Sequence, residues 1–269
     1  MQKVRPKKEL GQHFLTDMGV ARRIASTLDE YRGMPVLEVG PGMGVLTRFL
    51  LEAGHDLTVV ELDSESVAYL SANEPDLQGR IVEADFLRLD LDELMGGRDF
   101  CVIGNYPYNI SSQIFFKILD YKDRVPCCSG MLQREVAERL AAGPGTKTRG
   151  ILSVLLQAWY TVEYLFTVSE GVFNPPPKVK SGVVRLTRNS REVLPCDERL
   201  FRNVVKTTFG QRRKTIRNSL RPIVPELSDQ LAASPLLQKR PEQLTVEEFF
   251  ELTNLVAASR RNTVEAEGQ

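Results

Sequence analysis

The chain has 269 residues, which exceeds the common single-domain size of roughly 100–200 residues, so we expect one large α/β domain and a smaller second domain. Its 42% hydrophobic and 26% charged residues are typical of a folded, water-soluble protein, and no run approaches the ~18 apolar residues that cross a bilayer. The basic first residues lack the apolar core of a secretory signal, so we expect a cytoplasmic protein without a membrane segment.

Cysteine and histidine are too few and too scattered for most metal and nucleophile sites. The four cysteines show no CxxC spacing, and His13 and His55 are the only histidines. The sequence therefore predicts no metal centre and neither a Ser-His-Asp nor a Cys-His arrangement. Any chemistry must proceed without a histidine base.

The net charge is zero, but its distribution is uneven, because residues 181–269 hold 15 Lys and Arg against 11 Asp and Glu. One stretch, from Lys206 to Arg221, contains no acidic residue. Its cations are Lys206, Arg212, Arg213, Lys214, Arg217 and Arg221. Such a basic segment is suited to a polyanion, although a solvated helix face remains an alternative.

In chain order, the first motif is Leu10-Gly11-Gln12-His13-Phe14-Leu15, which we expect to form a turn. Asp17 can cap the helix that follows, in which Val20, Ile24 and Leu28 keep helical spacing. Taken alone, His13 is expected to be an ordinary turn residue.

A strand, a glycine cluster and a helix come next. The apolar run from Met34 to Val39 is followed by Gly40, Gly42 and Gly44 and then by a helical pattern through Leu50, as in the first turn of a nucleotide-binding sheet. The spacing is GxGxG, and Glu38 precedes it. That carboxylate would repel a pyrophosphate but attract a sulfonium and an ammonium, which favours S-adenosylmethionine over NAD.

Two further predicted strands end in acidic residues. Leu57–Val60 leads into Glu61, which can accept hydrogen bonds from ribose hydroxyls, and Arg80–Ala84 leads into Asp85 and Phe86, which suit an adenine amine and ring. Singly, each acid could be a surface residue. Because the carboxyl ends of parallel strands meet at one edge of the sheet, the three strand ends together predict a cofactor site.

The fourth strand, Phe100–Ile103, leads to Asn105-Tyr106-Pro107-Tyr108. Asn105 offers a side-chain carbonyl, Pro107 can fix the backbone carbonyl of Tyr106, and Tyr108 offers a flat face. These groups would hold a planar amine and its base. An ordinary β-turn is the alternative for these residues by themselves.

The later part of the chain predicts a strand at Ser129–Leu132, helices at Arg134–Ala142 and Gly150–Trp159, and strands at Val162–Val168 and Gly182–Leu186. A Pro-rich connection between the last two strands carries Phe173, which we expect to be exposed, and Lys178. From Asp197 onward only helical periodicity appears. We therefore expect domains at residues 1–189 and 190–269.

With these residues assembled, the chain resembles the bacterial small-subunit rRNA adenine dimethyltransferases (the KsgA/RsmA family) from Lys7 to about Leu255. The most specific stretches are Leu10–Leu15, Leu37–Gly44, Asn105–Tyr108, Gln133–Leu140, Phe173–Val184 and Phe209–Leu220. The resemblance implies an α/β class I methyltransferase domain with a Rossmann-like, mainly parallel seven-stranded sheet. It also implies a small C-terminal helical domain that binds RNA or the ribosome.

The implied activity is transfer of two methyl groups to N6 of each of two adjacent adenines in the 3′-terminal hairpin of 16S rRNA, within the immature small ribosomal subunit. S-adenosylmethionine is the cofactor, and we expect a monomer that takes part in ribosome biogenesis. The predicted cofactor site comprises Gln12, His13, Leu15, Glu38, Gly40, Gly42, Gly44, Glu61, Leu62, Asp85, Phe86 and Asn105. The predicted catalytic residues are Asn105, Tyr106, Pro107 and Tyr108, with Tyr108 and Phe173 stacking on the target base. Lys178 and the six cations of the basic segment are the predicted RNA contacts.

Two positions depart from the family pattern: Tyr106 stands where an aliphatic residue is commoner, and Arg149-Gly150 replaces a tyrosine-glycine pair. Three other functions stay open. The first is methylation of a large-subunit rRNA adenine, as in antibiotic resistance, and the second is methylation of DNA adenine. The third is an assembly factor whose binding matters more than its chemistry.

Overall fold

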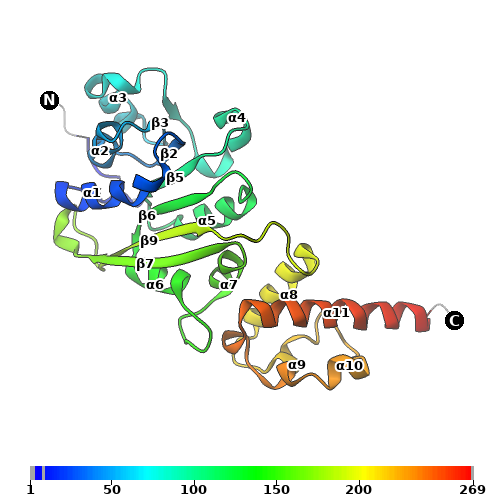
Figure 1. Cartoon of the computed structure of the whole chain (residues 1–269). Helices are drawn as coiled ribbons and strands as arrows, with labels where there is room; N and C mark the ends of the chain where they lie inside the picture. Colours follow the sequence, from blue (N-terminus) through cyan, green and yellow to red (C-terminus); the bar gives the residue numbers. More distant parts are fainter. Residues whose placement is uncertain (1–3, 8–9, 268–269) are drawn as a thin grey trace. The chain divides into compact units, whose positions relative to one another are not determined.

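The computed structural model describes residues 4–7 and 10–267, with side chains as far as residue 261 (Figure 1). Residues 1–3 and 8 of the predicted basic N-terminal arm lie outside the described residues. The chain forms two compact units, one made of Met1–Glu138 and Thr161–Arg188 and the other of Arg139–Tyr160 and Asn189–Gln269.

Residues 139–160, which we expected in the first domain, thus belong with the C-terminal helices. The reason lies in helix α7 (Ile151–Gln157), whose side chains from Leu152 to Leu156 are buried and which packs against α8 (Glu198–Gly210). Apolar side chains of this helix find their partners in the helical unit, and sequence order did not reveal that.

The first unit is built on a seven-stranded sheet with the order β4-β3-β2-β5-β6-β9-β7 (Figure 1). Its strands are β2 (Pro35–Val39), β3 (Asp56–Glu61), β4 (Ile81–Glu83), β5 (Cys101–Asn105), β6 (Cys127–Gln133), β7 (Tyr160–Val168) and β9 (Ser181–Arg188). Neighbours from β4 through β6 pair in parallel, and β9 pairs antiparallel with β6. The predicted mainly parallel seven-stranded sheet is confirmed.

Strand β2 lies between β3 and β5, so the strand order reverses there and a crevice opens at the carboxyl ends of β2 and β5. Right-handed crossovers place α2 (Val45–Glu52) and α3 (Ser64–Asn73) on one face of the sheet and α4 (Leu91–Met95) and α5 (Ser111–Asp120) on the other. Helix α1 (Met18–Ala25) packs against α2. Since both faces are covered, β2 and β5 are buried along almost their whole length, and Glu38 in β2 and Asn105 at the end of β5 are the polar side chains in these two mainly apolar strands.

A second, two-stranded sheet was not predicted. Strand β1 (Phe14–Leu15) pairs antiparallel with β8 (Phe173–Asn174), so Leu15 lies opposite Phe173. The expectation of a turn is wrong for Phe14 and Leu15, and the expectation of an exposed Phe173 is wrong because its side chain is only 4% exposed within the apolar core. Strands of two residues carry no alternation that sequence could reveal.

The second unit is helical, with α9 (Ile216–Ser219), α10 (Asp229–Ala232) and α11 (Val246–Glu267) following α8, while α6 (Arg134–Ala141) crosses the division between the units. Two aromatic pairs join α8 to α11: Phe201 with Phe250, and Phe209 with Phe249. The basic segment is not one helix, because the chain turns between α8 and α9. Short 3₁₀ helices occur at Ser26–Tyr31, Pro75–Leu77, Phe86–Arg88, Glu170–Val172, Pro235–Gln238 and Pro241–Gln243. None of the helices in the described ranges is long and apolar enough to cross a membrane.

Candidate active site

A pocket opens in the first unit at the carboxyl ends of β2, β3 and β5. Nearly all the residues predicted to bind cofactor line it: Gln12, His13, Leu15, Glu38, Gly40, Gly42, Glu61, Leu62, Asp85, Phe86 and Asn105. Tyr106, Pro107 and Tyr108 also line it, whereas Gly44 and Phe173 do not. Among the lining residues that sequence reasoning missed are Gly11 and Asn109, which approach each other closely, since a Cβ on Gly11 would stand 2.7 Å from Asn109 Oδ1.

The glycine loop needs its glycines for two different reasons. Gly42 has φ +57°, and a Cβ on it would stand 2.9 Å from the Phe14 ring, so the loop and the N-terminal segment touch at this point. Gly44 has φ +76° and forms the N-cap of α2, where a Cβ would meet Leu70 at 3.0 Å. Gly44 therefore shapes the start of a helix, and Gly42 shapes the pocket.

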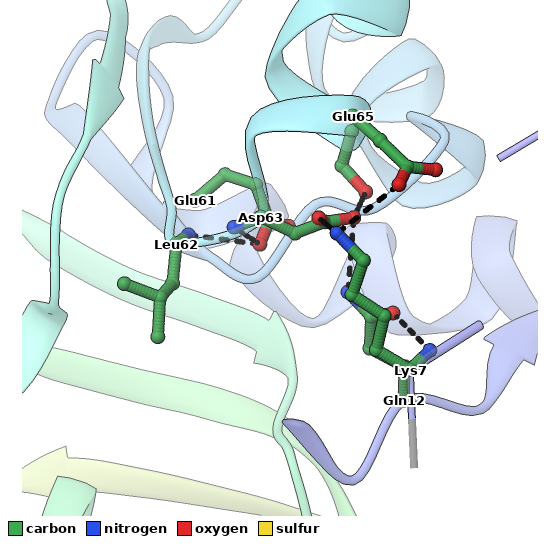
Figure 2. Close-up of polar contacts among 7 residues, drawn as sticks. Lys7, Gln12, Glu61, Leu62, Asp63 and Glu65 are labelled. Carbon is green, nitrogen blue, oxygen red and sulfur yellow. Dashed lines mark hydrogen bonds and ion pairs between the residues drawn. The ribbon is translucent and has the colours of Figure 1, made fainter. Parts of the chain in front are cut away.

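Glu61 is held by the backbone of its own turn and of the glycine loop. Its Oε1 accepts hydrogen bonds from the N–H groups of Leu62 and Asp63, both at 2.9 Å, as Figure 2 shows. Its Oε2 accepts one from Gly42 N–H at 3.0 Å. Burial to 6% exposure raises the pKa of Glu61, and these three bonds oppose that rise. A carboxylate accepts roughly four hydrogen bonds, so Oε2 keeps a lone pair for a hydroxyl donor.

Glu38 is the more deeply buried carboxyl, with 1% exposure. Burial is the main cause that raises its pKa to about 8; a 2.7 Å hydrogen bond donated by Thr47 Oγ1 opposes the rise, and the nearby Glu61 charge adds to it. A cation placed in the pocket would favour the ionised form of Glu38.

Asp85 caps a short 3₁₀ helix, since its Oδ1 accepts a hydrogen bond from Leu87 N–H at 3.0 Å, and its Oδ2 lies 3.4 Å from Arg88 Nε. The neighbouring Phe86 ring is buried, with the Lys117 ammonium 5.5 Å from its centroid. The structure thus brings the predicted acceptor and the predicted aromatic to one wall of the pocket.

Asn105 is oriented by the N-terminal segment. Its Nδ2 donates a 2.9 Å hydrogen bond to the carbonyl oxygen of His13. Since the amide nitrogen is used in this way, Oδ1 must be the free end of the side chain, and it has no hydrogen-bond partner among residues 4–7 and 10–267. A hydrogen-bond acceptor is therefore presented at the pocket.

The Tyr106 ring points into the core, which explains how this position tolerates an aromatic residue. Its hydroxyl donates to Ser129 O at 2.7 Å, and a Cβ on Gly130 would stand 2.5 Å from the ring. Its backbone N–H donates to Met131 O at 2.9 Å. Tyr106 thereby ties the Asn-Tyr-Pro-Tyr turn to β6 at both its main chain and its side chain.

Tyr108 is anchored at its hydroxyl, which lies 2.5 Å from Ser181 Oγ, and its ring centroid is 5.3 Å from that of His13. Burial raises the pKa of the Tyr108 hydroxyl against the opposing effect of the Ser181 bond, so the phenol is neutral at physiological pH. Phe173, the other predicted stacking residue, lies in the apolar core and away from the pocket wall.

The predicted RNA contacts differ in how they are held. Lys178 in the first unit and Lys206, Arg213, Lys214 and Arg221 in the second are exposed. Two guanidinium groups are instead tied to main-chain carbonyls: Arg212 donates to Lys147 O, and Arg217 donates to Ala232 O at 3.1 Å.

The sequence matches the profile of the ribosomal RNA adenine dimethylase family over residues 3–258. The chain belongs to this family. A curated relative, Ribosomal RNA small subunit methyltransferase A of Parabacteroides distasonis, is 70% identical over 253 residues, which cover 94% of each chain.

Solved structures agree on the fold. The dimethyladenosine transferase from Plasmodium falciparum has a TM-score of 0.76 at 22% identity, over 92% of this chain and 98% of that one. The 23S rRNA methyltransferase ErmE has a TM-score of 0.66 at 28% identity, and the match covers 90% of this chain and 99% of that one.

The enzyme is thus an rRNA adenine dimethyltransferase with the class I fold, and its cofactor is S-adenosylmethionine. The pocket suits that cofactor. Two buried carboxyl groups, Glu38 and Glu61, line it, Glu61 Oε2 keeps a free lone pair, and Gly42 of the glycine loop lies against the Phe14 ring. Within the described ranges no cluster of three His, Cys, Asp or Glu side chains is arranged to bind a metal.

Proposed function

We propose that this enzyme dimethylates N6 of two adjacent adenines in the 3′-terminal hairpin of 16S rRNA, on the immature small ribosomal subunit. It would act in the cytoplasm as a monomer, and the modification would take part in subunit biogenesis. The 70% identity to a relative named for the small subunit supports this target. The open Oδ1 of Asn105 supports the mechanism.

An exocyclic adenine amine is a poor nucleophile because its lone pair is delocalised into the ring. Asn105 Oδ1 and the carbonyl oxygen of Tyr106 would accept hydrogen bonds from the two N–H groups of the amine. The nitrogen would then become pyramidal and direct its lone pair into the pocket. Bound S-adenosylmethionine supplies an electrophilic methyl group. The two oxygen dipoles would also stabilise the positive charge that develops on nitrogen as the N–C bond forms. The methylated nitrogen would then lose one proton to water, so no strong base is required.

The second methyl transfer sets a further condition. A monomethylated amine has one hydrogen left, so only one of the two acceptors can be satisfied. The pocket must then admit a methyl group beside the acceptor oxygen that no longer receives a hydrogen bond. The rigid Tyr106 main chain, bonded to Met131, is suited to keep the remaining hydrogen bond.

The target base must leave its stack to reach this site, at a cost of a few kcal/mol. Stacking on Tyr108 would recover about 1–3 kcal/mol. Phe173 could cover the second face only after its side chain leaves the apolar core, so we propose that role for the RNA-bound enzyme alone. The basic segment and Lys178 would hold RNA phosphates, and residues 190–269 would contribute the main RNA-binding surface.

The test is incubation with unmethylated small subunits and labelled S-adenosylmethionine, followed by mapping of the modified nucleotides. We expect two adjacent dimethyladenines near the 3′ end of 16S rRNA. Label in large-subunit rRNA or in DNA would contradict the proposal. Measuring subunit maturation separately with Asn105→Ala distinguishes an assembly role that does not depend on methylation.

A further inference from the structure

The N-terminal segment is fastened over the turn that carries Glu61. We call Lys7 and residues 10–16 the strap. The Lys7 ammonium forms ion pairs with Asp63 and, at 3.3 Å, with Glu65, as Figure 2 shows. Lys7 N–H donates to Gln12 Oε1 at 2.8 Å, and Gln12 Nε2 lies 3.4 Å from Asp63 Oδ2. Asp63, 2% exposed, is therefore the common partner of both strap side chains.

The other end of the strap reaches the methyl-transfer site. His13 O accepts the hydrogen bond that orients Asn105, and the Phe14 ring packs on Gly42 of the glycine loop. Beyond them, Leu15 pairs with Phe173, and Thr16 N–H donates to Val172 O at 2.8 Å. The strap thus connects the predicted ribose carboxylate to the predicted amine acceptor.

We propose that Lys7, Gln12 and Asp63 form a latch that holds the strap against the cofactor pocket and thereby positions Asn105 for methyl transfer. The inference rests on the proposed role of Asn105 as amine acceptor. Lys7 and Asp63 are positioning residues, since they act through Gln12 and His13 and do not line the pocket themselves.

The latch has to be charged to work. Burial opposes ionisation of Asp63, but the hydrogen bonds from Lys7, Ser66 and Gln12 together outweigh it and hold its pKa below the ordinary value. The hydrogen bond to Asp63 in turn raises the pKa of Lys7. Both groups are ionised at neutral pH. Removing the Lys7 ammonium alone would leave the buried Asp63 carboxylate without its main hydrogen-bond donor. The loss favours detachment of the strap, because water can then reach the carboxylate.

Cofactor binding and the latch are also linked through the 61–63 turn. Glu61 Oε1 accepts a hydrogen bond from the N–H of Asp63. The same turn therefore holds the Glu61 carboxylate, the proposed ribose contact, and the Asp63 carboxylate that binds Lys7. A cofactor that orders this turn stabilises the latch, and by reciprocity the latch raises the affinity for the cofactor.

The experiment compares Lys7→Met, Lys7→Arg and, as a matched control, Arg5→Met. Arg5 is exposed and has no partner in the part of the chain that the structure describes. We would measure S-adenosylmethionine affinity by calorimetry without RNA, hydrogen exchange at the Thr16 amide, which donates to Val172 O, and kcat and KM on small subunits. Lys7→Met should weaken cofactor binding about tenfold, speed exchange and lower kcat at saturating cofactor. Lys7→Arg should keep the cofactor affinity, the exchange rate and kcat close to those of the unchanged enzyme. Arg5→Met should leave the affinity and the exchange rate unchanged.

A raised KM for subunits in Lys7→Met, with cofactor affinity and exchange unchanged, would make Lys7 an RNA contact and overturn the latch. A lower melting temperature with every other quantity unchanged would reduce the ion pair to a stabilising contact. If Lys7→Met does not fold, Gln12→Ala, which keeps the ion pair, should still speed exchange at Thr16; unchanged exchange there would also count against the latch. Because cofactor affinity is measured without RNA, a different methylation target would leave this test intact.

Discussion

The cofactor pocket and the basic segment place their functional groups in opposite ways. Around the pocket, Glu61, Asn105 and Tyr106 each make hydrogen bonds to the main chain of another segment. In the basic segment, Arg213 and Lys214 extend from a turn into solvent. Transfer of a methyl group needs acceptors held in place before the substrate arrives, whereas phosphate contacts need charge that can adapt to the RNA. The following variants test this contrast.

Asn105→Ala should have the largest effect. Loss of the Oδ1 acceptor should lower turnover by about 10²–10³, the range seen when one preorganised hydrogen-bond partner of a transition state is removed. Cofactor affinity should change much less. Single-turnover methyl transfer and calorimetry measure the two quantities. Unchanged turnover with weakened cofactor binding would reverse the assignment.

Replacement of Arg212, Arg213 and Lys214 together by Ala should weaken RNA binding by about tenfold to a hundredfold and flatten its salt dependence, by roughly 0.7–0.9 in log–log slope for each phosphate that the variant no longer neutralises. Since Arg212 already donates to Lys147 O, Arg213 and Lys214 should account for most of the change in slope. Filter binding over a salt series measures it. An unchanged slope would remove this turn from the RNA-binding surface, and Asn105→Ala serves as a control that keeps the slope.

Arg149 offers a test of a buried charge without the partners that the pocket acids have. It is 1% exposed, and its three guanidinium nitrogens have no hydrogen-bond partner within the described residues. Burial accordingly lowers its pKa. Arg149→Met should raise the free energy of unfolding by about 1–3 kcal/mol, because unsatisfied buried donors are removed. Urea unfolding measures this gain, and a destabilised variant would show that the guanidinium has a partner in solution.

Glu38 should make cofactor binding depend on pH. Its pKa of about 8 means that it is largely protonated at pH 7 in the free enzyme, while a cationic cofactor favours the carboxylate. The affinity for the cofactor should therefore rise by up to about tenfold per pH unit below pH 8 and level off above it. On binding, Glu38 should release a proton, which the buffer takes up. Calorimetry in buffers of different ionisation enthalpy measures the number of protons released on binding, and Glu38→Gln should abolish this release.

The same carboxyl affects stability in a defined direction. Between the ordinary glutamate pKa of 4.5 and about 8, the folded state binds more protons at Glu38 than the unfolded state does. Its contribution to the free energy of unfolding must therefore fall as pH rises through this window. A contribution that stays constant through this window would mean that Glu38 is already ionised in the free enzyme.

Much of the site could be predicted because its signals are local. The glycine spacing, the acids after strands and Asn105 after a buried strand are each visible in a few consecutive residues, and parallel topology brings such strand ends to one edge. Gly44 shows the limit. Its place in the motif suggested a ligand contact, but in the structure it is the N-cap of α2 and does not line the pocket. Gly40, Gly42 and Gly44 all have positive φ, so the spacing alone does not tell which of them lines the pocket.

The sequence by itself determined the seven strands, the order of motifs along the sheet edge and the family, because strand and helix periodicity and motif spacing are properties of short segments. Tertiary structure alone decided that residues 139–160 join the helical unit, that Leu15 pairs with a buried Phe173, and that Lys7 meets Asp63. Each of these depends on which surfaces pack together across some 40 to 160 positions of the chain. No local pattern in the sequence encodes such a choice, since it is made by competition among all the apolar and charged groups that folding brings within reach.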